Sequence, residues 1–597
     1  MKRYNEEVTD DEVLWGLLDQ GYTDFAKVSL RGLQMSRLPN MKGCRVAEFD
    51  CSNNRLTTLK GAPEVSGTFD CSKNRLVSLQ YAPAGPLDSF LCMDNRLESL
   101  AGAPQVVERE FDCSFNRLES LEGGPSSVKV SYTCSFNQLK SLEGAPDDVR
   151  GSFDCCWNRL TSLRGAPQEV EAGFKCGNNE LVSLEGAPPH VTGEFDCREN
   201  QLVSLAHCPQ SVAGRFVCSH NRLASLEGAP PGVKKEMDCS FNLLESLTGA
   251  PPAVQGRFDC SHNRLVSLKG APTVVRLAFN CSSNKLDSLD FCPQEVEMDF
   301  FCSDNCLTSL QGSPPGVKRD FDCSGNRLRS LAGCPAGVSR DFFCRDNLLT
   351  TLEYVPLGVS RHFNCASNKL GSLESCPPGI LGNFSCADNR LRSLSGVPAG
   401  VEGSFDCGRN QLSSLDGCPP GVQGSFICSR NKLSSLEGSP QGILEKMDCS
   451  YNQLSSLRGM PKDVTGYFDC SHNNLESLEF APLSTKEGFN CSHNRLKSLK
   501  GAPLGVEGSY DCSHNCLETL DYVASGVTWR FDCSYNLLRS LRGAPEQVSW
   551  HFDCSHNRII SWEYLPLHVQ GKMVVEGNPA GTLDECRNDH LADVEGD

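Results

Sequence analysis

Cysteine is the residue type with the most potential chemistry in this sequence, because 35 of the 597 residues are cysteines. Twenty-five of them recur at a fixed place, at Cys51, Cys71 and then every 21 residues from Cys92 to Cys554. Cysteines that neighbour each other in a parallel ladder lie about 4.8 Å apart, whereas a relaxed disulfide needs Cβ atoms about 3.8 Å apart. We therefore expect buried free thiols that serve packing, and a reducing compartment, the cytoplasm.

Two cysteine pairs and one histidine row have spacings that could serve metal binding. The pairs are Cys302-x3-Cys306 and Cys512-x3-Cys516, but only the first member of each belongs to the repeat series, so we predict no zinc site there. The row is formed by three histidines that stand two residues after successive repeat cysteines: His472, His493 and His514. They are either solvated turn residues or a stripe for a transition metal, and the pattern leaves that choice open. Our prediction is a protein without a cofactor or a metal ion.

Aromatic and acidic side chains also recur in register with the cysteines. Phe115, Phe136 and Trp157 fill the histidine position in three successive repeats, where they either stack on one another or form part of a partner site. Fourteen of the 25 repeats place Asp directly before the cysteine. These carboxylates form either a solvated ladder balanced by outward arginines such as Arg55, or a site for a basic peptide or Ca²⁺.

The position before the cysteine follows a second period of two repeats. Its residues other than Asp and Asn are spaced by 42 or 84 positions, and they are Leu91, Thr133, Lys175, Val217, Phe301, Phe343, Ser385 and Ile427. Duplication of a two-repeat unit produces such a period, but large apolar residues aligned on an exposed strand face are typical of a binding surface. The hypothesis is a docking row of Phe301, Phe343 and Ile427, bordered by Asp322 and Asp406, for an extended peptide with basic and apolar residues.

The repeat Phe258-Asp-Cys-Ser-His-Asn-Arg-Leu-Val-Ser-Leu-Lys-Gly-Ala-Pro-Thr-Val-Val275 contains the elements that must position these side chains. Phe258 and Cys260 point to one side of a short strand and Asp259 to the other. Asn263 comes where the chain leaves the strand, so its amide can bond backbone groups of the turn and of the neighbouring coil. The Gly-Ala-Pro segment leaves too little room for a returning helix. One coil cannot bury its own apolar edge, so the coils must stack.

This pattern resembles the leucine-rich-repeat family, whose core runs L-x-x-L-x-L-x-x-N-x-L. Val254-x3-Phe258-x-Cys260-x2-Asn263-x-Leu265 is that core with Phe and Cys in two leucine positions. The short period and the trailing proline look most like the repeats of effectors injected by Gram-negative pathogens, and similar F-x-C-S-x-N-x-L repeats occur in phage and bacterial proteins. The resemblance implies an all-β repeat solenoid, a horseshoe or superhelix with one short parallel strand per coil and an extended convex side. Some of those effectors carry a C-terminal ubiquitin-ligase domain, which we do not expect here after residue 578.

The two ends of the array are expected to differ from the coils. We predict an N-terminal helical cap over residues 1–27, a solenoid of about 26 coils over 28–578, and a C-terminal cap or tail over 579–597. Thr9-Asp-Asp-Glu12 predicts a capping box at the start of a short helix that Gly21 ends. Thr582-Leu-Asp-Glu585 predicts a second short helix.

Composition narrows the functional classes. The excess of 74 acidic over 56 basic residues argues against nucleic acid as a partner, and no apolar stretch approaches the roughly 18 residues of a membrane span. No signal peptide is recognisable, so we expect a protein that is not exported through a cleaved signal. No phosphate loop or catalytic constellation is recognisable either, so we expect no enzyme. The leading hypothesis is a cytoplasmic protein-binding scaffold with a long concave β-surface, which would lie in a host cytoplasm if it is delivered as the effectors are. The alternative is a structural or assembly component, of phage or surface-layer type, that self-associates.

Overall fold

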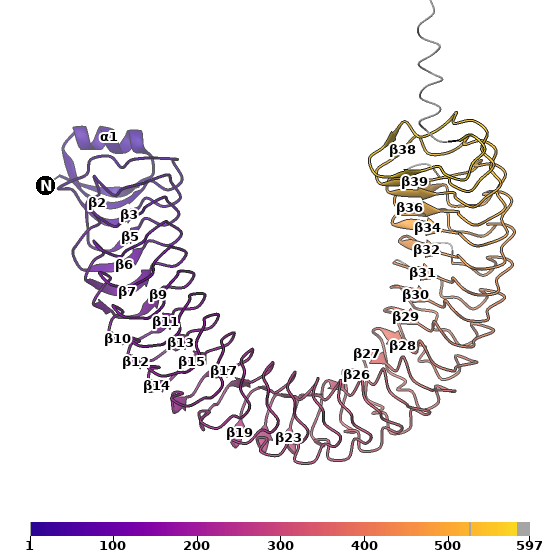
Figure 1. The fold of residues 1–597 in the computed structure, drawn as a ribbon, viewed down its shortest axis with the longest axis horizontal. Helices are drawn as coiled ribbons and strands as arrows, with labels where there is room; N and C mark the ends of the chain where they lie inside the picture. Colours follow the sequence, from indigo (N-terminus) through magenta and orange to yellow (C-terminus); the bar gives the residue numbers. More distant parts are fainter. Residues whose placement is uncertain (1, 444, 462–463, 525–526, 582–597) are drawn as a thin grey trace, which may run out of the picture. The chain divides into compact units, whose positions relative to one another are not determined.

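The computed structural model describes residues 2–443, 445–461, 464–524 and 527–581, which fall into two compact units, Met1–Asn305 and Cys306–Asp597. Each unit is a parallel β-solenoid in which nearly every coil contributes one short strand to a sheet along its inner side (Figure 1). The predicted all-β solenoid with one strand per coil is therefore confirmed. The helix predicted at Thr582–Glu585 lies outside the described residues.

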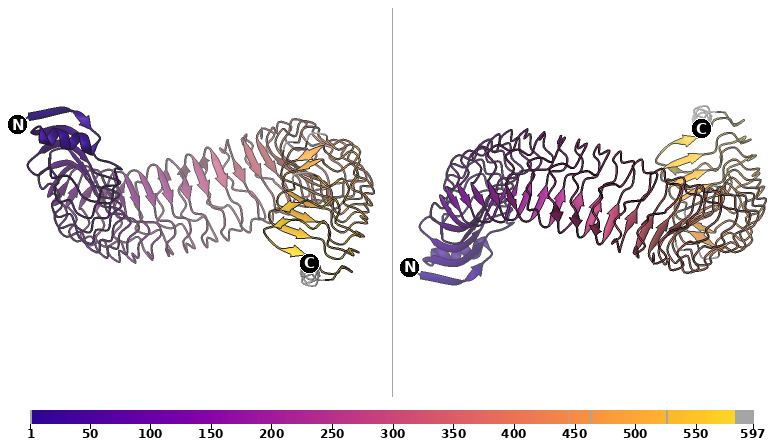
Figure 2. Two further views of the ribbon diagram at one scale, coloured as in Figure 1. Left: turned by 90° about the horizontal axis from the view of Figure 1, so that it is seen from above. Right: turned by 90° about the horizontal axis from the view of Figure 1, so that it is seen from below.

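The main-sheet strands of both units end at the residue before the repeat cysteine, or at the corresponding residue in the first and last coils. In the first unit they are β2 (Tyr22–Ser29), β3 (Arg45–Asp50), β5 (Thr68–Asp70), β6 (Leu87–Leu91), β7 (Val106–Asp112), β9 (Ser131–Thr133), β11 (Ser152–Asp154), β13 (Gly173–Lys175), β15 (Glu194–Asp196), β17 (Arg215–Val217), β18 (Glu236–Asp238), β20 (Phe258–Asp259), β22 (Ala278–Asn280) and β24 (Asp299–Phe301). In the second unit they are β25 (Phe321–Asp322), β26 (Asp341–Phe343), β27 (His362–Asn364), β28 (Phe384–Ser385), β29 (Phe405–Asp406), β30 (Phe426–Ile427), β31 (Met447–Asp448), β32 (Tyr467–Asp469), β34 (Gly488–Asn490), β36 (Ser509–Asp511), β37 (Arg530–Asp532), β39 (His551–Asp553) and β41 (Met573–Val574). Within each unit the strand arrows follow one another in the same direction (Figure 2).

The strands pair in register, so that equivalent residues of neighbouring coils lie side by side. Phe153, for example, lies between Tyr132 and Phe174. Several coils form a second, two-residue strand shortly before the main one: β4 (Glu64–Val65), β8 (Ser127–Val128), β10 (Asp148–Val149), β12 (Glu169–Val170), β14 (His190–Val191), β16 (Ser211–Val212), β19 (Ala253–Val254), β21 (Val274–Val275), β23 (Glu295–Val296), β33 (Ser484–Thr485), β35 (Gly505–Val506), β38 (Gln547–Val548) and β40 (His568–Val569). In-register stacking turns each repeat position into a column along the solenoid.

The N-terminal end of the first unit is a β–α–β arrangement. Strand β1 (Lys2–Val8) pairs in parallel with β2, and helix α1 (Asp11–Asp19) connects them (Figure 1). The N-cap of α1 is Asp10, whose carboxylate accepts hydrogen bonds from the N–H groups of Glu12 and Val13. The prediction of Thr9 as the capping residue is therefore wrong by one position. α1 is the single helix that the described residues form, and no helix in that part of the chain is long and apolar enough to cross a membrane.

Columns of phenylalanine, cysteine and leucine fill the core. The core phenylalanines stack on one another with centroids 5.5–6.0 Å apart over most of their length, as in Phe153, Phe174, Phe195 and Phe216. Every repeat cysteine is buried. These columns remove apolar surface from water only because adjacent coils cover each other's edges.

The asparagine ladder binds neighbouring coils together, as predicted. Asn473 Nδ2 donates to the carbonyl of Cys449 in the preceding coil (3.1 Å) and to that of Cys470 in its own coil (3.1 Å). Its Oδ1 accepts from the N–H of Leu454 (3.0 Å). The same set of bonds recurs from Asn54 to Asn557 in both units. The side chain thus pairs backbone groups that the turn leaves without partners.

Candidate functional site

The residues before the repeat cysteines line the inner strand face, but they are less exposed than predicted. Where the residue is Asp, one carboxylate oxygen accepts from the N–H two residues later, as from Ser52 to Asp50 (2.8 Å). Asp259 is 8 % exposed and Val217 is fully buried, whereas Phe301, Phe343 and Ile427 are half-buried. These side chains thus lie on the strand face, but neighbouring coils shield them in part, so the column is less exposed than a solvent-facing row.

Basic residues on the strand face, not the predicted outward arginines, balance several of these carboxylates. Arg257 pairs with Asp259 (2.5 Å), and Lys446 pairs with Asp448 (3.1 Å). Arg55, named above as a counter-charge, instead donates to the side chain of Gln34 (3.1 Å).

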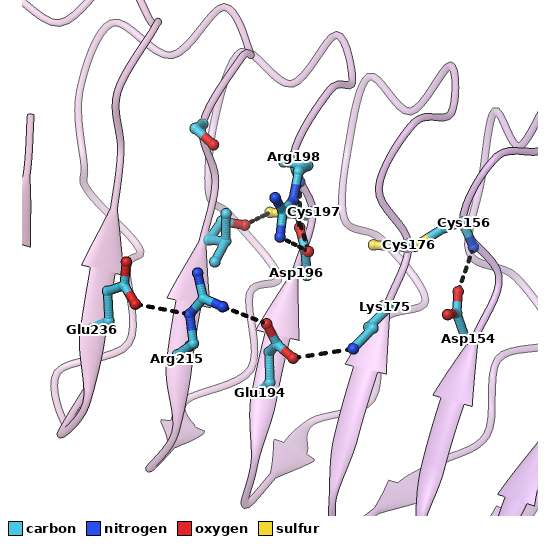
Figure 3. A network of polar contacts seen from close by, with 12 residues as sticks. Asp154, Cys156, Lys175, Cys176, Glu194, Asp196, Cys197, Arg198, Arg215 and Glu236 are labelled. Atoms are coloured by element: carbon cyan, nitrogen blue, oxygen red, sulfur yellow. Dashed lines mark hydrogen bonds and ion pairs between the residues drawn. The ribbon is translucent and has the colours of Figure 1, made fainter. Parts of the chain in front are cut away.

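In the first unit, charges on the strand face form a chain of ion pairs across successive strands (Figure 3). Glu194 lies between Lys175 (3.3 Å) and Arg215 (3.7 Å), and Arg215 also contacts Glu236 (2.9 Å). Oppositely charged residues on successive strands therefore satisfy one another. This stretch offers little unpaired charge to a partner.

In the second unit, the strand face contains a hollow of about 290 Å³ over strands β26 to β30. Its walls are formed by Phe343 and Ile427, two of the residues that the sequence predicted, and Asp406 also lines it. Asn364 and Ser385 occupy the same column between them. We call this feature the strand-face hollow. The hollow exists because Ser385 is small, whereas the same column has large apolar side chains two coils before it and two coils after it.

A chain of side-chain-to-backbone hydrogen bonds forms one rim of the strand-face hollow. His362 Nδ1 accepts from the N–H of Asn383 (2.9 Å), Asn383 Oδ1 from that of Ser404 (2.9 Å), and Ser404 Oγ from that of Ser425 (3.1 Å). Because Nδ1 of His362 is an acceptor, the neutral ring carries its proton on Nε2. Each of these side chains is thus bonded to the next coil.

The other two residues of the predicted row do not line the strand-face hollow. Phe301 lies at the end of β24 in the first unit, and Asp322 lies in β25 of the second unit. The structure thus brings together Phe343, Asp406 and Ile427 from the predicted set.

Ring columns form at the second residue after the cysteine, where the backbone is left-handed. Phe115, Phe136 and Trp157 have φ of 52–54° and stack with centroids 4.2 and 5.3 Å apart. A bulky residue at positive φ is unfavourable, and face-to-face stacking offsets part of that cost. All three rings are exposed, at 48, 38 and 52 % of their surface, so the column is accessible to a partner.

The predicted histidine stripe is part of a longer ring column. His472, His493 and His514 stack with centroids 4.0 Å apart, and the column also contains Tyr451, Tyr535 and His556. Burial, followed by neighbouring positive charge, lowers the pKa of both His472 and His493. Lone pairs in parallel ring planes 4 Å apart cannot converge on one metal, whose distance to nitrogen is about 2.1 Å. Among the described residues, no group of three or more His, Cys, Asp or Glu side chains is arranged to hold a metal ion.

The repeat cysteines are buried free thiols. Every cysteine in the described part of the chain is free, and burial raises the pKa of thiols such as Cys113 and Cys239. Several Sγ–H groups donate to the carbonyl one coil further on, as from Cys239 to Asp259 (3.2 Å). The nucleophilic thiolate is thus disfavoured along the whole column.

Sequence reasoning overlooked the residues that follow the repeat cysteines in the coils that form the strand-face hollow. Most coils have Ser there, and in several its hydroxyl donates to the preceding Asp, as from Ser240 to Asp238 (2.6 Å). Three successive coils instead have Ala366, Ala387 and Gly408. This run of three successive coils without the serine was the available signal, because most other coils of the array keep it.

The described coils define a leucine-rich-repeat solenoid of short, helix-free repeats. A structural comparison agrees with this class: YopM from Yersinia enterocolitica WA-314 matches with a TM-score of 0.60 and 25% identity over 78% of this chain and 95% of that one. YopM from Yersinia pestis, described as a leucine-rich effector protein, matches at 24% identity over 55% of this chain and 84% of that one, with a TM-score of 0.42. The functional domain of InlJ from Listeria monocytogenes, described as including a cysteine ladder, matches at 17% identity over 52% and 70%, with a TM-score of 0.39. No protein-family model and no curated protein matches the sequence.

Proposed function

We propose that the protein is a non-enzymatic scaffold that binds a protein partner along its inner strand face, and that the strand-face hollow is the principal docking point. The single observation that supports this most directly is the hollow itself, a gap of about 290 Å³ between Phe343 and Ile427 in an otherwise regular column. Leucine-rich-repeat folds serve binding more often than catalysis, because a regular solenoid offers an open surface and not a pocket of converging groups.

Two further surfaces belong to the proposal as secondary contacts. The exposed ring column of Phe115, Phe136 and Trp157 presents aromatic surface of the kind that dominates interface energies. Phe301 in the first unit and Asp322 in the second occupy the same position of the repeat as the hollow residues, and each is proposed as a contact of its own unit.

The test is partner capture by paired variants. Phe343→Ser and Ile427→Ser remove the two walls of the hollow, and together they should weaken capture of the principal partner by roughly tenfold or more. Leu91→Ser, at the same position in the first unit, is the matched control, because Leu91 is also half-buried and lies outside the hollow. The proposal fails if the double variant and the control capture the partner equally well. Loss of folding in the double variant but not in the control would instead assign Phe343 and Ile427 to the core.

Two observations support a biological setting for the proposed scaffold. The match to YopM favours an effector-like scaffold that acts in a host cytoplasm. The buried thiol column favours a reducing compartment, since its Sγ–H donors exist only in the reduced state. The rival is an assembly component, and sedimentation separates the two: a self-associating chain that captures no other protein would favour assembly.

A further inference from the structure

Asn364, at the floor of the strand-face hollow, has an amide donor group with no acceptor. Its Oδ1 accepts from the N–H of Ala366 (3.0 Å), but its Nδ2 makes no hydrogen bond to any residue that the structure describes. Asparagines in the same position elsewhere are satisfied. Asn280 Nδ2 donates to Asp259 (3.1 Å) and Asn490 Nδ2 donates to Asp469 (3.3 Å), each in the preceding coil. Asn364 lacks this acceptor because the preceding coil has Phe343 in that position.

Asp406, two coils further on, has a carboxylate oxygen that lacks a donor, just as Asn364 has a donor that lacks an acceptor. Its Oδ1 accepts from the N–H of Gly408 (2.9 Å), and within the described residues its Oδ2 has no hydrogen bond or ion pair. Asp448 and Asp532, in the same column, are paired with Lys446 (3.1 Å) and Arg530 (2.8 Å). In addition, the coil of Asp406 has Gly408 where the coils of Asp238, Asp259 and Asp448 have a serine whose hydroxyl donates to Oδ1 of the Asp. Among the described residues Asp406 is therefore a half-buried carboxylate without a counter-ion, as are Asp70 and Asp112 in the first unit, but Asp406 alone of these three lines the hollow.

The charges that surround Asp406 do not neutralise it. Burial raises the pKa of Asp406, while Lys446 and Arg409 lower it to a smaller extent. Lys446 is engaged with Asp448, and Arg409 contributes electrostatically without an ion pair. A cationic group from a partner would gain a partly desolvated carboxylate as its contact, which strengthens such a hydrogen bond relative to one on an open surface.

The spacing of these groups matches an extended peptide. Adjacent strands lie about 4.8 Å apart, so that Asn364 and Asp406 are about 10 Å apart and the walls at Phe343 and Ile427 about 19 Å apart. An extended chain that rises about 3.3 Å per residue crosses the polar floor in about three residues and the whole hollow in about six. The hydroxyl of Ser385, which also makes no hydrogen bond among the described residues, lies between the two polar ends.

We propose that the strand-face hollow binds an extended peptide segment in which a carbonyl accepts from Asn364, a lysine or arginine side chain pairs with Asp406, and apolar side chains at either end contact Phe343 and Ile427. This inference rests on the proposed function and adds to it the chemistry of the partner. The segment crosses the strands and does not extend the sheet, because both edges of each inner strand are already paired to neighbouring coils.

The probe is a displayed library of random dodecapeptides, selected on the full chain and on Ser385→Trp, which fills the hollow. Three variants then test the chemistry. Asp406→Asn keeps the turn acceptor, since Asn364 and Asn490 occupy this position naturally. Asp406→Lys reverses the charge, and Lys175 provides a native precedent for lysine at this position. Gly408→Ser introduces the serine that most other coils have, whose hydroxyl donates to the preceding Asp in coils such as that of Asp238. Asp70→Asn, at the same position in the first unit, is the matched control.

The expected result is a set of peptides with Lys or Arg next to aliphatic or aromatic residues, which bind the full chain but not Ser385→Trp. Asp406→Asn should weaken a selected synthetic peptide by about tenfold, Gly408→Ser should weaken it in the same direction, and Asp70→Asn should leave it unchanged. Asp406→Lys should select acidic peptides instead.

Two outcomes overturn the inference in different ways. If peptides compete for the hollow but lack basic residues, or if Asp406→Lys selects the same peptides as the native chain, the cation is wrong while docking at the hollow stands. If the native chain selects nothing that Ser385→Trp does not, no extended peptide binds there, and the capture experiment with Phe343→Ser and Ile427→Ser decides separately whether the hollow docks a folded partner.

Discussion

Replacing Asn473 by alanine tests whether the asparagine ladder carries the energy that its hydrogen bonds suggest. The matched control is its neighbour Asn474, whose side chain makes no hydrogen bond in the described part of the chain. The two substitutions remove the same chemical group from adjacent residues. Any difference between them therefore measures the ladder and not the loss of an asparagine.

The expected magnitude follows from which partners are left without a bond. The Cys449 carbonyl loses Asn473 but keeps Asn452 (3.1 Å), and the Cys470 carbonyl keeps Asn494 (3.1 Å). The N–H of Leu454, by contrast, has Asn473 Oδ1 as its acceptor, and Leu454 is fully buried. One orphaned buried donor costs about 1–3 kcal/mol, so Asn473→Ala should destabilise the second unit by about that amount.

The assay combines urea unfolding with hydrogen exchange. Repeat arrays open locally, because each coil contacts only its neighbours, so exchange at the Leu454 amide should accelerate at least about fivefold while distant coils keep their protection. Asn474→Ala should stay within about 0.5 kcal/mol of the native chain. If the two variants have the same stability and the same exchange rate at Leu454, the ladder contributes nothing net, and the account of coil cohesion given above is refuted.

Two further predictions concern titratable side chains. The pKa of His472 and His493 is lowered in the folded protein. As the pH falls, the unfolded chain therefore takes up protons first, near the ordinary histidine pKa of about 6.5. The stability that the neutral rings contribute is present above that pH and is lost as the pH falls through the pKa of the folded protein. The urea midpoint of the second unit should therefore drop between pH 7.5 and 5.5, and His493→Phe, which keeps a stacked ring, should flatten that drop; an equal drop in both proteins would exclude the ring column as its source. Cys516 is exposed whereas the repeat cysteines are buried, so Cys516→Ser should remove one fast-reacting thiol from a titration of the folded protein with a thiol reagent, and an unchanged count would show that Cys516 is shielded.

Much of the fold was predictable because each position of the repeat has one physical task. Cys260 and Phe258 had to be buried, since two residues with that spacing share one strand face and recur in register. The bonds of Asn263 to its own coil and its neighbour were predictable because a side-chain amide is both donor and acceptor at a place where the chain leaves the strand. The stacking of the histidine stripe followed from the same register.

The N-terminal end of the array was less predictable, for a local reason. Thr9 and Asp10 are both good N-cap residues, and which of them caps the helix depends on where strand β1 ends. β1 itself carries no repeat signature and is a strand because β2 supplies its partner.

The candidate site was also predictable from the sequence only in part. The sequence by itself determined that Phe343, Asp406 and Ile427 share one column, since a 21-residue period places equivalent residues on adjacent strands. It could not determine how deep that column lies or which of its polar groups remain unpaired, because those depend on side chains contributed by neighbouring coils. Asp259 is covered and paired while Asp406 is not, although the two occupy the same position in their repeats. Only the tertiary structure decided this, because Arg257 pairs with Asp259 whereas Ser404, in the equivalent position before Asp406, is part of the hydrogen-bonded rim.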